Sequence, residues 1–122
     1  MKLHSSVPSG VNTITGYGEG YVKVRDERIE QNSIVTPDQI VPWSVEGFDQ
    51  LAEADFAIFA AMDLEILLIG TGPKQRFPHP KLTRALTEKR VGIEAMDVQA
   101  ACRTYNILVA EGRRVAAALL FK

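Results

Sequence analysis

The sequence has few of the residues that build disulfides, metal sites and catalytic triads. Its 122 residues include one cysteine, Cys102, and two histidines, His4 and His79. A single thiol forms no intramolecular disulfide, and three ligands scattered along the chain fall short of a zinc set. Without a Gly-x-Ser-x-Gly segment, a serine or cysteine triad has no support either. We therefore expect no metal and no cofactor, and we assign no catalytic residue.

Long apolar runs and an excess of one charge are also missing. The longest apolar runs are far shorter than the roughly 20 residues that span a bilayer. The 14 basic and 15 acidic residues are mixed along the chain, so no basic stripe is available for nucleic acid. The start, MKLHSSVPSG, has no apolar segment of signal-peptide length and no arginine. We expect a cytoplasmic protein with no transmembrane segment and no nucleic-acid partner.

The composition is that of a globular protein, with 46% hydrophobic and 24% charged residues. A chain of this length fits one hydrophobic core. Residues 1–12 mix Ser, Pro, Gly and Asn with little to bury, which is typical of a flexible N-terminal arm. We therefore expect the arm to be followed by a single α/β domain over residues 13–122.

The two halves of this domain have different patterns. Residues 14–41 alternate apolar and polar side chains over short windows, which predicts an N-terminal β-hairpin that turns at RDER and returns through IEQNSIV. Residues 48–62 are rich in Ala and predict a helix or two short helical turns. The second half alternates strand, helix, strand, helix and strand, which predicts an α/β layer with partly parallel strands.

The segment LEILLIGTGPKQRF ends an apolar strand in the turn Gly70-Thr71-Gly72. Position 75 is Gln, so the third glycine of the dinucleotide-binding fingerprint is missing, and the P-loop pattern is absent too. Two interpretations remain. The glycines serve a tight turn with unusual backbone angles, or the turn and Arg76 form a small anion pocket beyond the carboxyl end of the strand.

Asp97 follows the next strand, at the position of a helix N-cap, and begins the strongest helical pattern of the chain. It has two possible roles, as the cap or as a pocket carboxylate that orients a ligand or a partner's lysine. Arg103 and Asn106 lie on the side of this helix opposite its apolar arc. They are either solvated or covered by a second layer of structure.

The motifs LLIGTG, GIEAMD and AACRTYNILVAEGRRVAAALL resemble successive signatures of a small domain family of largely unknown function. That family includes a mitochondrial assembly factor of respiratory complex I and an adipogenesis-associated animal protein. The resemblance runs from about residue 13 to the end of the chain. It implies a three-layer α/β fold with a central mixed sheet, and a protein with no established catalytic activity.

Two functional hypotheses follow. The first is a non-enzymatic interaction or assembly-factor module with a protein partner, linked to a respiratory complex. The second is an anion-binding or small-molecule-binding protein, which includes the case of an enzyme, that uses clustered polar residues. The candidate binding residues are Gly70, Thr71, Gly72, Arg76, Asp97, Arg103 and Asn106. A homo-oligomer is compatible with either hypothesis.

Overall fold

The computed structural model describes residues 10–121, which form two sheets. The small sheet has the order β1 (Ile14–Gly18), β2 (Tyr21–Val24) and β3 (Glu27–Ile29), all antiparallel. The central sheet has the order β5 (Ile40–Pro42), β4 (Ser33–Val35), β8 (Val115–Leu120), β6 (Ile66–Thr71) and β7 (Gly92–Met96). Within it β6 runs parallel to β7 and β8, whereas β4 is antiparallel to β5 and β8. The predicted mixed sheet is confirmed.

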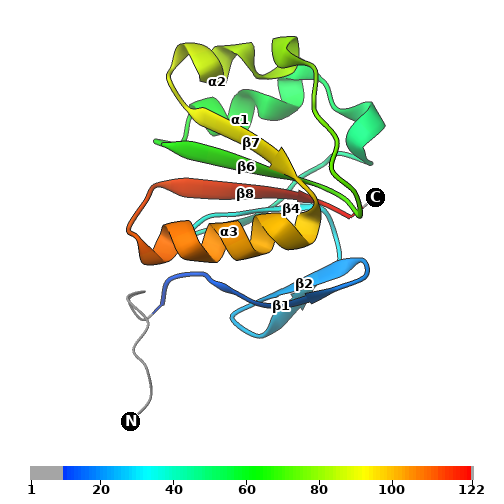
Figure 1. The fold of residues 1–122 in the computed structure, drawn as a ribbon, viewed down its shortest axis with the longest axis vertical. Helices are drawn as coiled ribbons and strands as arrows, with labels where there is room; N and C mark the ends of the chain where they lie inside the picture. Colours follow the sequence, from blue (N-terminus) through cyan, green and yellow to red (C-terminus); the bar gives the residue numbers. More distant parts are fainter. Residues whose placement is uncertain (1–9, 122) are drawn as a thin grey trace.

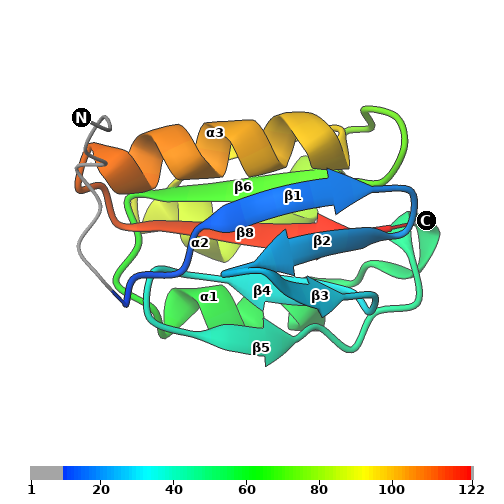
Figure 2. The same cartoon turned by 90° about the horizontal axis from the view of Figure 1, so that it is seen from below.

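The central sheet is the middle of three layers (Figure 1). One face is covered by the short helices α1 (Ala57–Ala60) and α2 (Arg84–Glu88) and by three 3-10 turns, Phe48–Gln50, Glu53–Phe56 and Pro80–Thr83. The other face is shared by the long helix α3 (Val98–Ala110) and the small sheet, whose strand β1 lies beside α3 (Figure 2). The three-layer arrangement is therefore as expected.

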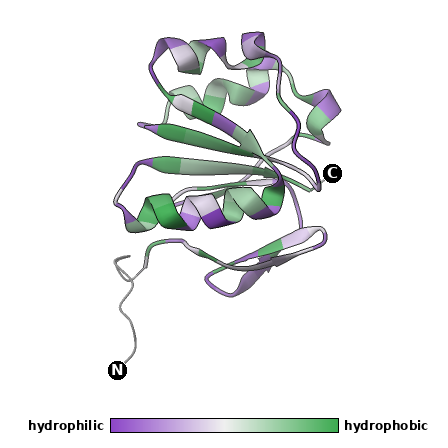
Figure 3. Cartoon of the chain, in the orientation of Figure 1, coloured by the Kyte–Doolittle hydropathy of each residue, from purple (hydrophilic) through white to green (hydrophobic). Residues whose placement is uncertain are grey.

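The middle strands of the central sheet are hydrophobic on both faces. All six residues of β8 are buried, as are the last five of β6, and both strands are coloured as hydrophobic in Figure 3. Parallel strands covered on both sides need such near-continuous apolar runs. This explains why LEILLIG and VAAALL lack the alternation of a half-exposed strand.

The face that carries α1 and α2 is filled by aromatic side chains. Trp43 meets Phe56 and Phe59 edge-on, with ring centroids 5.8 and 5.7 Å apart, and its Nε1–H donates to the Asp55 carbonyl oxygen at 3.1 Å. Edge-to-face pairs at such distances are the preferred aromatic geometry. This aromatic cluster of Trp43, Phe56 and Phe59 lies against the central strands as part of one hydrophobic core.

The N-terminal hairpin is present but belongs to a sheet of three strands. The segment predicted to return against the first strand is divided, because residues 27–29 form β3 whereas residues 33–35 join the central sheet as β4. The turn between β2 and β3 consists of Arg25 and Asp26, with φ of 52° and 69°. Two residues with positive φ form the turn that matches the twist of a tight hairpin.

Most of the predicted arm, residues 1–9, lies outside the described residues. Asn12 was also placed in the arm, and here the structure differs from the prediction. The Asn12 side chain is buried, its backbone N–H donates to the Pro37 carbonyl oxygen at 2.8 Å, and its Nδ2 donates to the Thr36 carbonyl oxygen at 3.0 Å. These partners are distant in sequence, so the composition of residues 1–12 did not indicate them.

Candidate functional site

The glycine turn at the end of β6 is shaped by close packing against α3. A Cβ added to Gly70 would lie 3.0 Å from Leu119 Cδ2 and 3.2 Å from the Cα of Val98. The second contact is with backbone, which has little room to move, so a Cβ here would crowd α3 and this position favours glycine. Gly72 has φ of 94°, in the region that favours glycine. Both glycines therefore have a structural task, whatever the turn binds.

Thr71, between them, is fully buried and organises the loop that follows. Its hydroxyl lies within donating distance of the Lys74 carbonyl oxygen at 2.8 Å and the Met96 carbonyl oxygen at 3.2 Å, and it accepts from the backbone N–H of Arg76 at 3.0 Å. The Arg76 side chain donates from Nη2 back to the Thr71 carbonyl oxygen at 2.8 Å and lies over the ring of Phe48. Arg76 is thus directed to the aromatic side of the sheet.

Asp97 caps α3 as the sequence predicts. Its Oδ1 accepts from the backbone N–H of Ala100 at 2.9 Å, and the N–H of Val98 donates to the Gly72 carbonyl oxygen at 2.9 Å. Two of the N–H groups that a helix start leaves unsatisfied are therefore engaged within the chain. The second bond also ties the glycine turn to the helix, so Gly72 and Asp97 lie together.

Arg103 and Asn106 lie farther along α3 and contact the small sheet. The Asn106 amide accepts from the N–H of Ile14 at 2.9 Å and donates to the Ile14 carbonyl oxygen at 2.7 Å. Arg103 Nη1 donates to the Tyr17 hydroxyl at 3.2 Å, and this hydrogen bond raises the pKa of Arg103. Of the two outcomes left open by the sequence, the small sheet partly covers Asn106, whereas Arg103 stays exposed to solvent. Both residues hold β1 rather than face the glycine turn.

A hollow of about 600 Å³ lies beyond the carboxyl ends of β6 and β8, between the β1–β2 turn and the start of α3. We call it the strand-end hollow. Of the predicted binding residues only Gly72 and Asp97 line it. Its walls are formed by Gly18, Glu19, Gly20, Gly72, Pro73, Asp97, Val98, Gln99 and Phe121.

The charge of the strand-end hollow is acidic. Its ionisable side chains are the carboxylates of Glu19 and Asp97, and Gln99 adds a neutral amide. Arg76, the predicted anion ligand, instead lines a different hollow with residues 46–50. Opposite charges attract across a few ångströms, most strongly where water is partly excluded. The strand-end hollow therefore suits a cationic group, such as the side chain of a lysine or arginine, better than an anion.

The residues of this hollow that the sequence did not indicate include three from the β1–β2 turn. Gly18, Glu19 and Gly20 are about fifty residues or more from the rest of the site, and only the docking of the small sheet beside α3 brings them there. No local pattern in the sequence signals such a contact. The proximity of Asp97 to the glycine turn, by contrast, follows from the parallel pairing of neighbouring strands.

Cys102 has no features of a reactive thiol. It is 1% exposed, and burial raises its pKa to about 12, which disfavours the thiolate needed for nucleophilic chemistry. Within residues 10–121, no three His, Cys, Asp or Glu side chains are grouped so as to hold a metal ion. In the same part of the chain, no helix has the length and apolar content to cross a membrane.

These features define a small three-layer α/β domain with an acidic hollow at its strand ends. The chain belongs to the family described as "Protein of unknown function (DUF498/DUF598)", which matches residues 14–120. It is similar to the mouse (Mus musculus) NADH dehydrogenase (ubiquinone) 1 alpha subcomplex assembly factor 3, with 30% identity over 120 residues. That match covers 97% of this chain but 64% of the mouse protein.

Solved bacterial structures share the fold. A crystal structure of a Bordetella parapertussis protein superimposes with a TM-score of 0.88 at 41% identity, and the match covers 94% of this chain and 100% of that one. A solution structure from Bordetella pertussis, described as a Mth938-like domain, has a TM-score of 0.83 at 36% identity and covers 98% and 92% of the two chains. At these identities the likeness extends to sequence as well as fold.

Proposed function

We propose that this protein is a non-enzymatic interaction module of the assembly-factor type, whose partners are subunits of a respiratory complex. The observation that carries the proposal is the 30% identity to a protein named as a complex I assembly factor, in an alignment that covers 97% of this chain. The acidic strand-end hollow supports it, because Glu19 and Asp97 offer a binding place for a basic side chain of a partner. The proposal includes a cytoplasmic location, beside the membrane that holds the complex.

Anion or small-molecule binding at the glycine turn has less support. The Arg76 guanidinium is directed away from the strand-end hollow, and the N–H of Val98 already donates to Gly72. An anion in the hollow would also lie beside the two carboxylates. We therefore favour a partner's basic side chain as the occupant.

The test is affinity capture from cells of the source organism, with quantitative identification of the proteins recovered. We compare the wild type with the double variant Glu19→Gln, Asp97→Asn, which removes both charges of the hollow and keeps an oxygen that caps α3. The control is Glu88→Gln on α2, an exposed carboxylate on the opposite face of the sheet. We expect respiratory subunits to be recovered with the wild type and the control, and severalfold less with the double variant.

Two results would contradict the proposal. If the wild type recovers no respiratory subunit above an untagged background, the assembly role fails. If the double variant recovers them as well as the wild type does, the role stands but the strand-end hollow is not where the partner binds.

A further inference from the structure

The small sheet is too narrow to cover the whole face of the central sheet on its side. Val22 and Val24 of β2 pack into the core with Val35 of β4. The neighbouring strand β5 pairs Ile40 with Val35, so these two side chains lie on the same face. Yet Ile40 is 39% exposed, whereas Val35 is fully buried. The cover provided by the small sheet therefore ends between β4 and β5.

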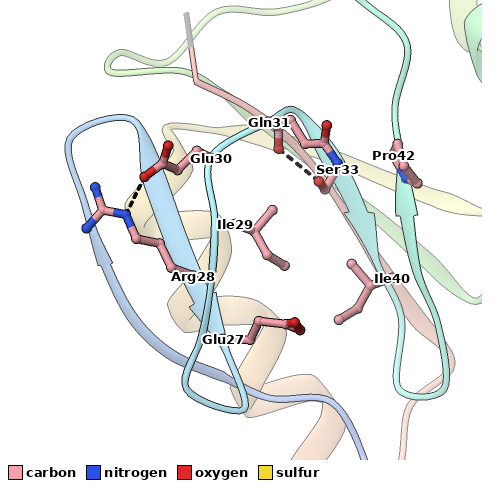
Figure 4. A pocket seen from close by; sticks show the side chains of 8 residues that line it. All are labelled: Glu27, Arg28, Ile29, Glu30, Gln31, Ser33, Ile40 and Pro42. Atoms are coloured by element: carbon pink, nitrogen blue, oxygen red, sulfur yellow. Dashed lines mark hydrogen bonds and ion pairs between the residues drawn. The ribbon is translucent and has the colours of Figure 1, made fainter.

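A hollow of about 680 Å³ occupies this uncovered strip (Figure 4). We call it the β3–β5 groove. Ile29 of β3 and Ile40 of β5 point toward each other across it, and Glu27 extends into it beside Ile40, whereas Arg28 points away to pair with Glu30. The groove is lined by Glu27, Arg28, Ile29, Glu30, Gln31, Ser33, Ile40 and Pro42.

The outer edge of β3 offers backbone groups to this groove. The two-residue turn at Arg25 and Asp26 makes Val24 and Glu27 the hydrogen-bonded pair next to it. Bonded and non-bonded pairs alternate in an antiparallel ladder, so the N–H and C=O of Arg28 point away from β2. In the part of the chain that the structure describes, no strand pairs with this edge.

The charges next to the groove select among occupants. The Glu27 carboxylate makes no ion pair within residues 10–121, whereas Glu30 is held by Arg28 at 2.6 Å, and the Arg28 guanidinium lies 3.8 Å from the centroid of the Tyr21 ring. Glu27 is thus the carboxylate on the groove side that can pair with a cation of the occupant. An occupant that covers the isoleucines and neutralises Glu27 must combine an aliphatic and a basic side chain.

We propose that β3 receives an added strand from a partner protein, which continues the small sheet over the exposed face of β5. Side chains on one face of a strand are two residues apart, and Ile29 and Glu27 have this spacing. An antiparallel segment therefore presents an aliphatic residue opposite Ile29 and, two residues later, a lysine or arginine opposite Glu27. Strand addition to a sheet edge is a general mode of peptide recognition.

A second copy of this chain is a poor occupant. Pairing two β3 strands about a two-fold axis at Arg28 would place the two Arg28 side chains opposite each other and Glu27 opposite Ile29. Like charges that face each other across a sheet are destabilising. The proposal rests on the proposed function, because it adds a second contact for the same class of partner, separate from the strand-end hollow.

The test uses capped pentapeptides and the 15N-labelled protein. The probe is acetyl-Thr-Val-Thr-Lys-Thr-amide, and the comparison peptide has Glu in place of Lys. We expect the probe to shift the amide signals of Arg28, Ile29 and Ile40, with a Kd of about 1 mM or tighter. The Glu peptide should bind about fivefold more weakly, as expected for the loss of an exposed ion pair. Glu27→Lys should reverse this preference, and the matched control Glu88→Lys on α2 should leave it unchanged.

The outcomes distinguish this proposal from the proposed function. The added strand is overturned if neither peptide shifts the groove signals or if Glu27→Lys leaves the preference for the Lys peptide intact. It is also overturned if light scattering shows a dimer whose dissociation on dilution shifts the amide signal of Arg28. Each of these results would leave the proposed function intact, provided that the wild type still captures respiratory subunits. Conversely, peptide binding without capture of respiratory subunits would support strand addition at the β3–β5 groove and contradict the assembly role.

Discussion

The two faces of the central sheet are held in different ways. On the face of α1 and α2, the short helical turns are fixed by the aromatic cluster of Trp43, Phe56 and Phe59. On the other face, Ile14, Val22 and Val24 of the small sheet pack into a hydrophobic core with α3. Hydrogen bonds add to this packing, since Asn106 binds the backbone of Ile14 and the Tyr105 hydroxyl donates to the Asn12 carbonyl oxygen at 2.9 Å. The first attachment depends on apolar packing, whereas the second combines apolar packing with hydrogen bonds of defined direction.

This difference has a functional consequence. Apolar packing tolerates small shifts in direction, whereas hydrogen bonds fix the orientation of the groups that they join. The small sheet supplies Glu19 to the strand-end hollow and Glu27 to the β3–β5 groove, so both candidate contacts depend on how precisely it is docked.

The largest expected loss of stability comes from a substitution on the aromatic face. Phe59 is fully buried, with its ring centroid 5.7 Å from that of Trp43. Phe59→Ala should lower the free energy of unfolding by about 3–5 kcal/mol, because it removes a buried ring and leaves a cavity. Urea unfolding followed by Trp43 fluorescence measures this loss. The control is Phe77→Ala, since Phe77 is 75% exposed and should change stability by less than about 0.5 kcal/mol.

The next largest loss of stability is expected from a substitution that removes the hydrogen bonds between α3 and the small sheet. Asn106→Ala leaves the N–H and C=O of Ile14 without their side-chain partner and should cost about 1–3 kcal/mol. Hydrogen exchange should speed up across β1, β2 and β3 more than in the central strands. Arg103→Ala removes an exposed bond from the same helix and serves as the control. Equal loss of protection in both sheets would show that the small sheet is not attached separately.

These two attachments differ in how far the sequence predicts them. The buried central strands follow from local apolar runs, and the start of α3 follows from Asp97 at the N-cap position. The partner of Asn106 could not be predicted, because Ile14 lies 92 residues away. The helix pattern showed only that Asn106 is outside the apolar arc, and a solvated face has the same pattern.

The candidate site was likewise predictable from the sequence only in part. Asp97 and Gly72 lie together because each follows one of two parallel strands of the same sheet, and parallel strands end at the same edge. Arg76 was grouped with them by sequence distance alone, yet its side chain folds back onto Thr71 and Phe48. The direction of a long side chain depends on the packing around it, which no spacing rule supplies.

Alkaline pH should weaken the fold through α3, where burial raises the pKa of Cys102 to about 12 from an ordinary value of 9.0. The unfolded thiol loses its proton above pH 9.0 while the folded thiol keeps it, so rising pH favours unfolding. The stability is fully present below this range and should fall by about 1.4 kcal/mol per pH unit within it.

Cys102→Ala tests this assignment, because the comparison concerns the slope and not the absolute stability. Urea unfolding between about pH 8 and pH 10 should give a flatter dependence for the variant than for the wild type. Burial also raises the pKa of Tyr105, so some slope should remain at the upper end. Parallel curves for the two proteins would show that the Cys102 thiol does not contribute.

The smallest expected loss of stability is at Asp97, where two substitutions distinguish its structural role from its role in binding. Asp97→Ala removes the acceptor for the Ala100 N–H and should cost about 1 kcal/mol, whereas Asp97→Asn keeps an accepting oxygen and should cost a few tenths. Thermal unfolding of the two variants measures the difference. If Asp97→Asn unfolds like the wild type and still recovers less of the respiratory partner, the charge of Asp97 acts in binding. If only Asp97→Ala loses the partner, the contribution of Asp97 is to hold the start of α3 against the glycine turn.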